Sequence, residues 1–268
     1  MNRRLHLKIV SPEYNIIKNE NPAFCVREMK FFNGVIMKIG ILGAMEREVK
    51  SLCAKLENSS IKQVGFLTFH CGKLYGKDVV VVQCGIGKVN AALSTQILIS
   101  NFGITHLINT GIAGAMAKGL GIFDFVVSSH AVYHDVDVTA FGYKLGQIPG
   151  LELEFCADSE MIKKAEAAFE SSEVSKKHKM ITGRIASGDQ FISGGERKEF
   201  IRDNFAPACV EMEGAAIAQV SSLNKIPFII VRCMSDMADD NISEVYEFNE
   251  DEAALISADF VEHIVENF

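Results

Sequence analysis

The chain has 268 residues, of which 34 are acidic and 27 are Lys or Arg, so the formal net charge is −7. Hydrophobic residues make up 48% of the sequence, which excludes disorder as the state of the whole chain. The acidic balance argues against a nucleic-acid groove, and no apolar run approaches the roughly 20 residues that a membrane-spanning helix needs.

Residues 1–36 differ in composition from the rest of the chain. They mix basic residues with prolines and asparagines, and Ser11-Pro12-Glu13 interrupts any signal-peptide core. We interpret residues 1–36 as a loosely ordered extension, or as translated sequence upstream of a natural start at Met37. Residues 37–268 are then predicted to form one domain.

From Met37 onward, strand-like and helix-like segments alternate. Short apolar runs predict strands over 38–42, 66–71, 77–83, 106–109, 123–128, 179–186, 208–210 and 227–233. Helical periodicity predicts helices over 45–56, 89–99, 159–169, 214–223 and 251–265. Residues 129–151 lack a helical period and are predicted to form a long functional loop. This alternation predicts an α/β domain with a mixed, mostly parallel central sheet flanked by helices.

The seven cysteines are predicted to be reduced. Their number is odd, and no Cys-x-x-Cys pair or zinc-ligand spacing occurs. Several lie in apolar segments that are predicted to be strands, which is typical of reduced, buried thiols in a cytoplasmic protein. We therefore expect a cytoplasmic location and no metal site.

Acidic residues gather after the predicted strands. Glu48, Glu211, Glu213 and Asp236 all follow strand-like runs. Ligands of open α/β sheets bind at the carboxyl ends of strands, and a gathering of acids there is costly unless function requires it. Arg232, near the end of the last predicted strand, is a residue type that neutralises buried carboxylates.

Other motifs in the sequence are weaker. Gly85-Ile86-Gly87-Lys88 lacks the Gly and the Ser or Thr of a Walker phosphate loop. Gly111 and Gly114 do not form a dinucleotide fingerprint, so tight turns and close backbone approach to a ligand both stay open. His130 and His134 lie near acidic residues in the sequence. Their spacing of four residues would indicate a metal site on a helix, but this segment is predicted to be strand and loop, so the spacing is not evidence for one. Structural or interface histidines are the preferred interpretation.

Seven motifs in order resemble the bacterial 5′-methylthioadenosine/S-adenosylhomocysteine nucleosidases of the purine nucleoside phosphorylase superfamily. The motifs occupy residues 37–48, 84–89, 109–114, 133–143, 187–192, 210–213 and 235–236. The resemblance implies hydrolysis of an N-ribosidic bond to adenine and a thioribose, without a cofactor or metal. It implies that Glu48 activates water, that Asp236 protonates adenine N7, and that Glu213 grips the ribose hydroxyls beside Met212.

The resemblance also implies a wider substrate site and a homodimer. The further substrate-binding candidates are Met45, Ile112, Gly114, Phe191, Ile192, Glu211, Arg232, Ser235 and Tyr246. Phe191 is expected to stack on the purine. Ile112 stands where some members have Ser, and Tyr246 stands where some have Phe near the alkylthio pocket. The positions that match residues reaching into the neighbouring subunit's site are Val138, Phe141 and Pro149.

The chemistry of the residues agrees with this reaction. Adenine leaves poorly as an anion, so the reaction needs a group that donates a proton to it. Asp236 follows an apolar strand, where desolvation favours the protonated form of a carboxylic acid. Glu48 comes from a different strand and can act as base on water, while carboxylates stabilise the oxocarbenium charge. Two carboxylates with opposed protonation states are what this reaction requires.

Three alternatives remain at this stage. A phosphorylase would need an anion site built from Arg, whereas the strand ends offer an isolated Arg47 and Lys88. The same site could hydrolyse aminofutalosine or 5′-deoxyadenosine. A non-catalytic nucleoside-binding protein should have lost one of Glu48, Glu213 and Asp236, and all three are present.

Overall fold

The computed structural model describes residues 36–238 and 242–268, with the side chains of the last helix described from Asn249 onward. The predicted extension therefore lies outside the described residues, Ile36 excepted. The strands are β1 (Lys38–Gly43), β2 (Glu57–Val64), β3 (Leu67–Leu74), β4 (Lys77–Gln83), β5 (His106–Asn109), β6 (Ile112–Ala115), β7 (Phe125–Tyr133), β8 (Phe155–Cys156), β9 (Met180–Ser187), β10 (Cys209–Glu211) and β11 (Phe228–Asp236). The α-helices are α1 (Glu46–Ala54), α2 (Lys88–Phe102), α3 (Ser159–Ser171), α4 (Gly195–Phe205), α5 (Gly214–Asn224) and α6 (Ile242–Glu266), with 3-10 turns η1 (Thr139–Phe141) and η2 (Glu173–Lys176).

The strands form one mixed sheet in the order β2-β3-β4-β1-β5-β11-β6-β10-β9-β7-β8. The neighbours β4, β1, β5 and β11 pair in parallel, as predicted for an α/β domain. A further antiparallel pairing of β11 with β7 closes β11, β6, β10, β9 and β7 into a ring. The central strand β11 thus belongs both to the open parallel sheet and to the ring.

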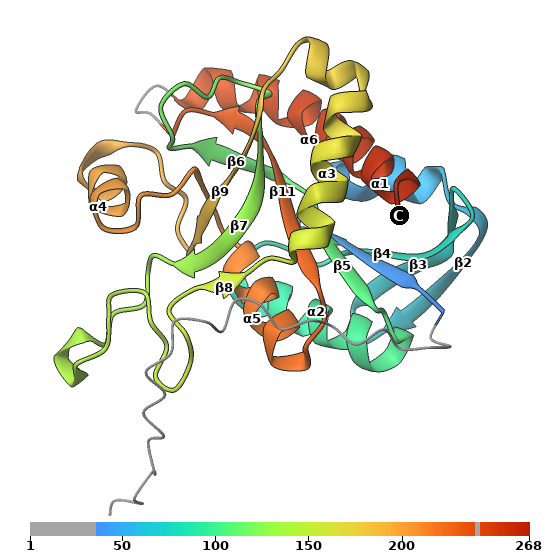
Figure 1. Ribbon diagram of the computed structural model, residues 1–268, viewed down its shortest axis with the longest axis horizontal. Coiled ribbons are helices and arrows are strands. Elements are labelled where there is room, and N and C mark those ends of the chain that lie inside the picture. Colours follow the sequence, from blue (N-terminus) through green and yellow to red (C-terminus); the bar gives the residue numbers. More distant parts are fainter. Residues whose placement is uncertain (1–35, 239–241) are drawn as a thin grey trace, which may run out of the picture. The chain divides into compact units, whose positions relative to one another are not determined.

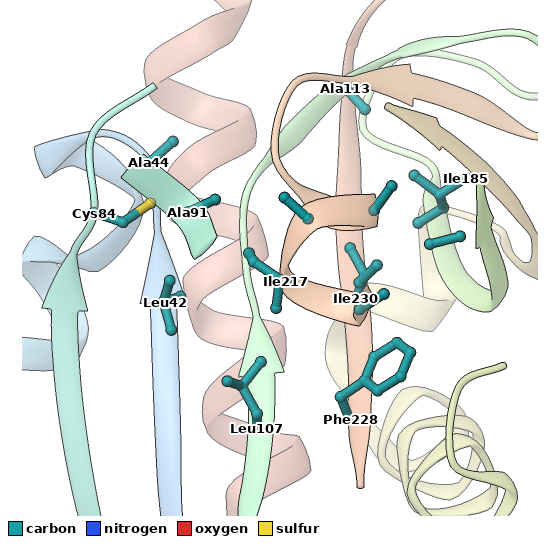
Figure 2. Packing of buried hydrophobic residues seen from close by; sticks show 14 of the residues in the cluster. Leu42, Ala44, Cys84, Ala91, Leu107, Ala113, Ile185, Ile217, Phe228 and Ile230 are labelled. Carbon is teal, nitrogen blue, oxygen red and sulfur yellow. The ribbon is translucent and has the colours of Figure 1, made fainter. Parts of the chain in front are cut away.

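Helices cover both faces of the sheet. One face carries α1, α3 and α6, and the other carries α2 and α5 (Figure 1). Alternate residues of β11 serve the two cores: Ile229 and Val231 pack on the α6 side, and Ile230 packs on the α5 side. Ile217 of α5 belongs to the same buried cluster as Phe228 and Ile230 of β11 (Figure 2). Because both faces of β11 are buried, its sequence contains a continuous run of apolar residues.

The predicted fold class is confirmed, but several elements differ from the sequence expectations. The strand β2 escaped prediction because seven of its eight residues are exposed, so it has no apolar pattern. Its place at the sheet edge comes from backbone pairing with β3. The predicted loop over residues 129–151 begins later than expected, because β7 runs on to Tyr133. Residues 195–205 form α4, a helix that buries only two residues and carries little periodic signal.

The last helix also begins nine residues earlier than predicted, at Ile242. No helix within the described ranges is long and apolar enough to cross a membrane. The six described cysteines are all free, whereas Cys25 lies outside the described residues.

Candidate active site

Glu48 is folded back onto the start of its own helix. It occupies the third position of α1, and its Oε2 accepts hydrogen bonds from the backbone N–H groups of Ala44 (2.6 Å) and Met45 (2.9 Å). Its Oε1 accepts a third, 3.1 Å long, from Ile112 at the start of β6. Burial raises the pKa of Glu48 above its ordinary value, and the nearby Arg232 charge and the amide bonds offset this only in part.

Arg232 is the cation at the centre of the site. It is buried on β11, and its Nη2 donates to Asn109 Oδ1 at 2.6 Å and to Glu211 Oε2 at 2.5 Å. A Cβ at Gly111 would lie 2.7 Å from Glu48 Oε1 and 3.2 Å from Arg232 Nη1, so only glycine lets these two groups approach. The sequence prediction that Arg232 neutralises buried carboxylates is consistent with this geometry.

Glu211 is fully engaged by the protein. Its Oε2 also accepts from the backbone N–H groups of Glu213 (3.1 Å) and Gly214 (2.7 Å) at the start of α5. Its Oε1 accepts from the Ser187 hydroxyl. The carboxylate therefore caps α5 and holds Arg232 in place, while a substrate contact of Glu211 stays a prediction.

Glu213 reaches across the site to the start of α2. Its Oε1 accepts a 2.7 Å hydrogen bond from Gly87 N–H. Burial and the neighbouring Glu211 charge raise the pKa of Glu213, and Arg232 and the Gly87 amide oppose this rise. Three buried carboxylates thus share one arginine.

We expect Glu213→Gln to stabilise the folded protein. Since the folded-state pKa lies above the ordinary value of 4.5, ionising Glu213 costs stability. The cost is absent below that value, where both states are protonated, and grows as the pH rises toward the folded-state pKa. Gln keeps the oxygen that accepts from Gly87. The variant's Tm should therefore exceed the wild-type Tm at pH 8 by about 2–4 °C for each kcal/mol relieved.

Thermal unfolding of both proteins from pH 4 to pH 8 tests this expectation. The difference should vanish near pH 4. The exposed Glu170 on α3 provides a matched control, since Glu170→Gln should leave Tm unchanged at every pH. A Glu213→Gln variant that is less stable than the wild type at pH 8 would contradict the assignment of a buried, costly charge.

Asp236 ends β11 beside β6. Its Oδ1 accepts from Ala238 N–H at 2.7 Å, and its Oδ2 accepts from the Ser235 hydroxyl at 2.9 Å. A Cβ at Gly114 would lie 2.9 Å from Asp236 Oδ1. Glu48 therefore meets β6 at Ile112, and Asp236 meets it two residues further on, a rise of about 7 Å along a strand.

A cluster of Lys88, Asp135 and Asp189 was not recognised from the sequence. Lys88 Nζ donates to Asp135 Oδ2 at 2.6 Å and lies 3.7 Å from Asp189 Oδ2. Asp189 Oδ1 accepts from Lys88 N–H at 2.8 Å, and Asp135 Oδ2 accepts from Asp189 N–H at 2.9 Å. These contacts tie the start of α2 to the segments after β7 and β9. The residues belong to motifs quoted above, but nothing in their spacing predicts that they meet.

The remaining predicted residues are distributed as follows. Ile112, Gly114, Ile192 and Ser235 are buried, Met45 and Met212 are half-buried, and Phe191 is 53% exposed on the segment after β9. Val138, Phe141 and Pro149 lie on the segment after β7, where Phe141 is 81% exposed. This segment extends away from the sheet (Figure 1). The side chain of Tyr246 lies outside the described part of the chain.

In the part of the chain that the structure describes, His130 and His134 do not gather with acids into a ligand set. Within residues 36–238 and 242–268, no three His, Cys, Asp or Glu side chains are grouped to hold a metal ion. His130 lies on β7 beside Ser129, and His134 is buried against Gly188. Burial lowers the pKa of His134, which favours the neutral imidazole.

Known proteins resemble this chain over the described domain. The sequence profile of the Phosphorylase superfamily matches residues 38–266. A 5′-methylthioadenosine/S-adenosylhomocysteine nucleosidase from Geobacillus sp. (strain WCH70) is 44% identical over 230 residues, which are 85% of this chain and 98% of that protein.

Solved structures agree with these matches. The nucleosidase of the same name from Colwellia psychrerythraea 34H, in complex with adenine, has a TM-score of 0.83 at 42% identity and covers 87% of this chain and 96% of that one. A futalosine hydrolase from Helicobacter pylori strain 26695 has a TM-score of 0.82 at 33% identity and covers 87% and 99%. Profile, identity and coverage together establish that the chain belongs to the Phosphorylase superfamily and, within it, to the family of the 5′-methylthioadenosine/S-adenosylhomocysteine nucleosidases.

Proposed function

We propose that this protein hydrolyses the N-ribosidic bond of 5′-methylthioadenosine and S-adenosylhomocysteine, releasing adenine and the 5-thioribose product. Its family supplies the class of reaction. The choice of water over phosphate rests on one observation: the backbone N–H groups at the starts of α1 and α2, where an anion would bind, are occupied by the protein's own carboxylates. Glu48 takes those of α1, and Glu213 and Asp189 take those of α2.

Lys88 and Arg232 do not offer a phosphate site either. Lys88 is neutralised by Asp135 and Asp189, and Arg232 by Glu211. A phosphate dianion brought to this edge would face buried carboxylates rather than unpaired cations. Water carries no charge and fits such a site.

Glu48 is proposed to activate that water. A carboxylate has about four acceptor positions, and three are filled by the backbone groups of Ala44, Met45 and Ile112. One position is left to accept a proton from water. The raised pKa of Glu48 brings its basicity closer to neutral pH, where a general base is most effective.

Asp236 is proposed to protonate adenine N7 from the other end of the site. The rise of about 7 Å between the two contact points on β6 leaves room for a water and a sugar between the carboxylates. Glu213, the residue before α5, is proposed to bind the ribose hydroxyls between them. Glu211 is proposed to have a positioning role, because it holds Arg232 and the start of α5 in place.

The test is adenine release from 5′-methylthioadenosine in phosphate-free buffer, followed by chromatography. We expect adenine and free methylthioribose, at a rate that added phosphate does not raise. Release that depends on phosphate and yields a sugar 1-phosphate would contradict hydrolysis. Aminofutalosine is a second candidate substrate, favoured by the similarity to the Helicobacter pylori futalosine hydrolase, and belongs in the same assay. The cytoplasmic location stays a prediction.

We also propose a homodimer in which Val138, Phe141 and Pro149 complete the partner's site. The support is the large exposed aromatic side chain of Phe141, in the turn η1 of the segment after β7. An apolar side chain of that size is stabilised when a partner covers it.

Phe141→Ala is expected to weaken binding of the 5′-methylthio group. The KM for 5′-methylthioadenosine should rise about tenfold, since burial of an aromatic side chain contributes about 1.5–3 kcal/mol and the ligand covers part of it. Phe66, also exposed but between β2 and β3, gives the control variant Phe66→Ala, which should retain the wild-type KM. An unchanged KM in a dimeric Phe141→Ala protein would refute the contribution in trans.

A further inference from the structure

The inner face of α4 contacts the turn that follows Asp236. Lys198 and Ile201 are three residues apart, so they lie on the same face of this helix. Ile201 is fully buried in an apolar cluster that also contains Ala238. Lys198 is half-buried, and its Nζ donates a 2.9 Å hydrogen bond to the backbone oxygen of Met237. The helix therefore holds the turn through an apolar group and a charged one.

Two hydrogen bonds of this turn belong to one peptide group. The Met237 carbonyl accepts from Lys198, and the Ala238 N–H donates to Asp236 Oδ1 at 2.7 Å. The carbonyl and the N–H are joined by the same planar C–N bond, so a rotation of that plane would break both hydrogen bonds together. A cation on the carbonyl also polarises the peptide group, which strengthens the N–H donor on its other side. Lys198 thus reaches the carboxyl group of Asp236 through a single peptide.

This peptide group is followed by strained backbone. Ala238 has a φ of +49°, in the left-handed region that an alanine adopts only at a cost in free energy. Its side chain is fully buried, and its Cβ would lie 3.1 Å from a Cβ placed at Gly114. Strained backbone of this kind persists only where the surrounding structure holds it. The burial of Ala238 and the hydrogen bond from Lys198 provide that support.

We propose that Lys198 is a positioning residue for the general acid of this reaction. By fixing the peptide between Met237 and Ala238, it keeps the Ala238 N–H on Asp236 Oδ1 and the carboxyl group turned toward one place in the site. The proposal rests on the proposed function and deepens it, because it concerns the acid that protonates adenine N7. It also gives α4, a helix that buries only two residues, a task in the chemistry.

The first variant is Lys198→Met, which removes the ammonium group but keeps an unbranched side chain. We expect kcat for adenine release from 5′-methylthioadenosine to fall about tenfold, because a hydrogen bond from a charged donor no longer holds the acid's turn. The KM should change little, since Lys198 touches no substrate. Lys198→Arg can still donate to the Met237 carbonyl and should retain most of the wild-type kcat.

Two comparisons show whether Lys198 acts through Asp236. A riboside with a p-nitrophenyl leaving group needs no acid, because p-nitrophenolate departs as a stable anion, so Lys198→Met should cleave it at the wild-type rate. In an Asp236→Asn background the acid is already absent, so adding Lys198→Met should lower adenine release no further. The matched control is Arg202→Met, which removes another cation of α4, one that pairs with Asp203, and should leave both rates unchanged.

The outcomes distinguish this proposal from the proposed function. An undiminished kcat in Lys198→Met, an equal fall on the two substrates, a further fall in the Asp236→Asn background, or a loss in Lys198→Arg as large as in Lys198→Met would overturn the role of Lys198 while leaving hydrolysis intact. A wild type that releases adenine from neither 5′-methylthioadenosine nor S-adenosylhomocysteine would overturn the proposed function, and the role of Lys198 with it. Thermal unfolding of each variant shows that the proteins compared are folded at the assay temperature.

Discussion

Asp236→Asn is expected to lower kcat for adenine release by about 10²–10⁴, the usual contribution of a general acid. The side chain keeps its shape, and its oxygen can still accept from Ala238 N–H. What it loses is the proton that adenine N7 needs before the purine can leave. Binding contacts are retained, so the KM for 5′-methylthioadenosine should change little.

A substrate that needs no acid separates this role from general damage to the site. A riboside with a p-nitrophenyl leaving group departs as a stable anion, so Asp236→Asn should cleave it at close to the wild-type rate. The steady-state rates of both substrates in both proteins provide the measurement. Equal losses on the two substrates would assign Asp236 to binding or structure, and an undiminished rate of adenine release would show that another group supplies the proton.

Glu48→Gln is expected to lower kcat by a similar factor of about 10²–10⁴, because the water loses its base. The base works in its ionised form, so the wild-type kcat/KM should fall as the pH drops through the raised pKa of Glu48. Glu48→Gln should lack this acidic limb. A pH profile of kcat/KM for the two proteins measures the difference, and an unchanged limb in the variant would assign it to another group.

The Gln side chain also places an amide donor where Ile112 N–H now meets Oε1, so stability has to be followed alongside rate. Added formate offers a control that folding defects cannot imitate. A small carboxylate that enters the space of the missing base should restore part of the activity of Glu48→Gln. It should not restore Asp236→Asn, which lacks a proton donor. If formate restored the activity of both variants equally, the assignment of Glu48 as the base and Asp236 as the acid would be contradicted.

The sequence by itself determined the elements with strong local patterns. The runs that became β1, β4 and β11 are buried on both faces, so their apolar residues are contiguous and visible without a structure. Glu48 follows β1 and Asp236 ends β11, and these strands run in the same direction, so their carboxyl ends lie at one edge. Glu213 follows the short buried strand β10, which pairs antiparallel with β6. The α/β class and the acids of the site were therefore accessible from local sequence alone.

Only the tertiary structure decided how those acids are used. Glu48 and Ile112 are 64 residues apart in sequence, and Lys88 and Asp189 are 101 apart, so no local pattern predicts their hydrogen bonds. Glu211 and Glu213 look alike in sequence, yet the fold turns the first toward Arg232 and the second toward Gly87. The physical reason is that a carboxylate's role depends on its burial and its donors, and both are set by chain segments that meet only when the sheet closes.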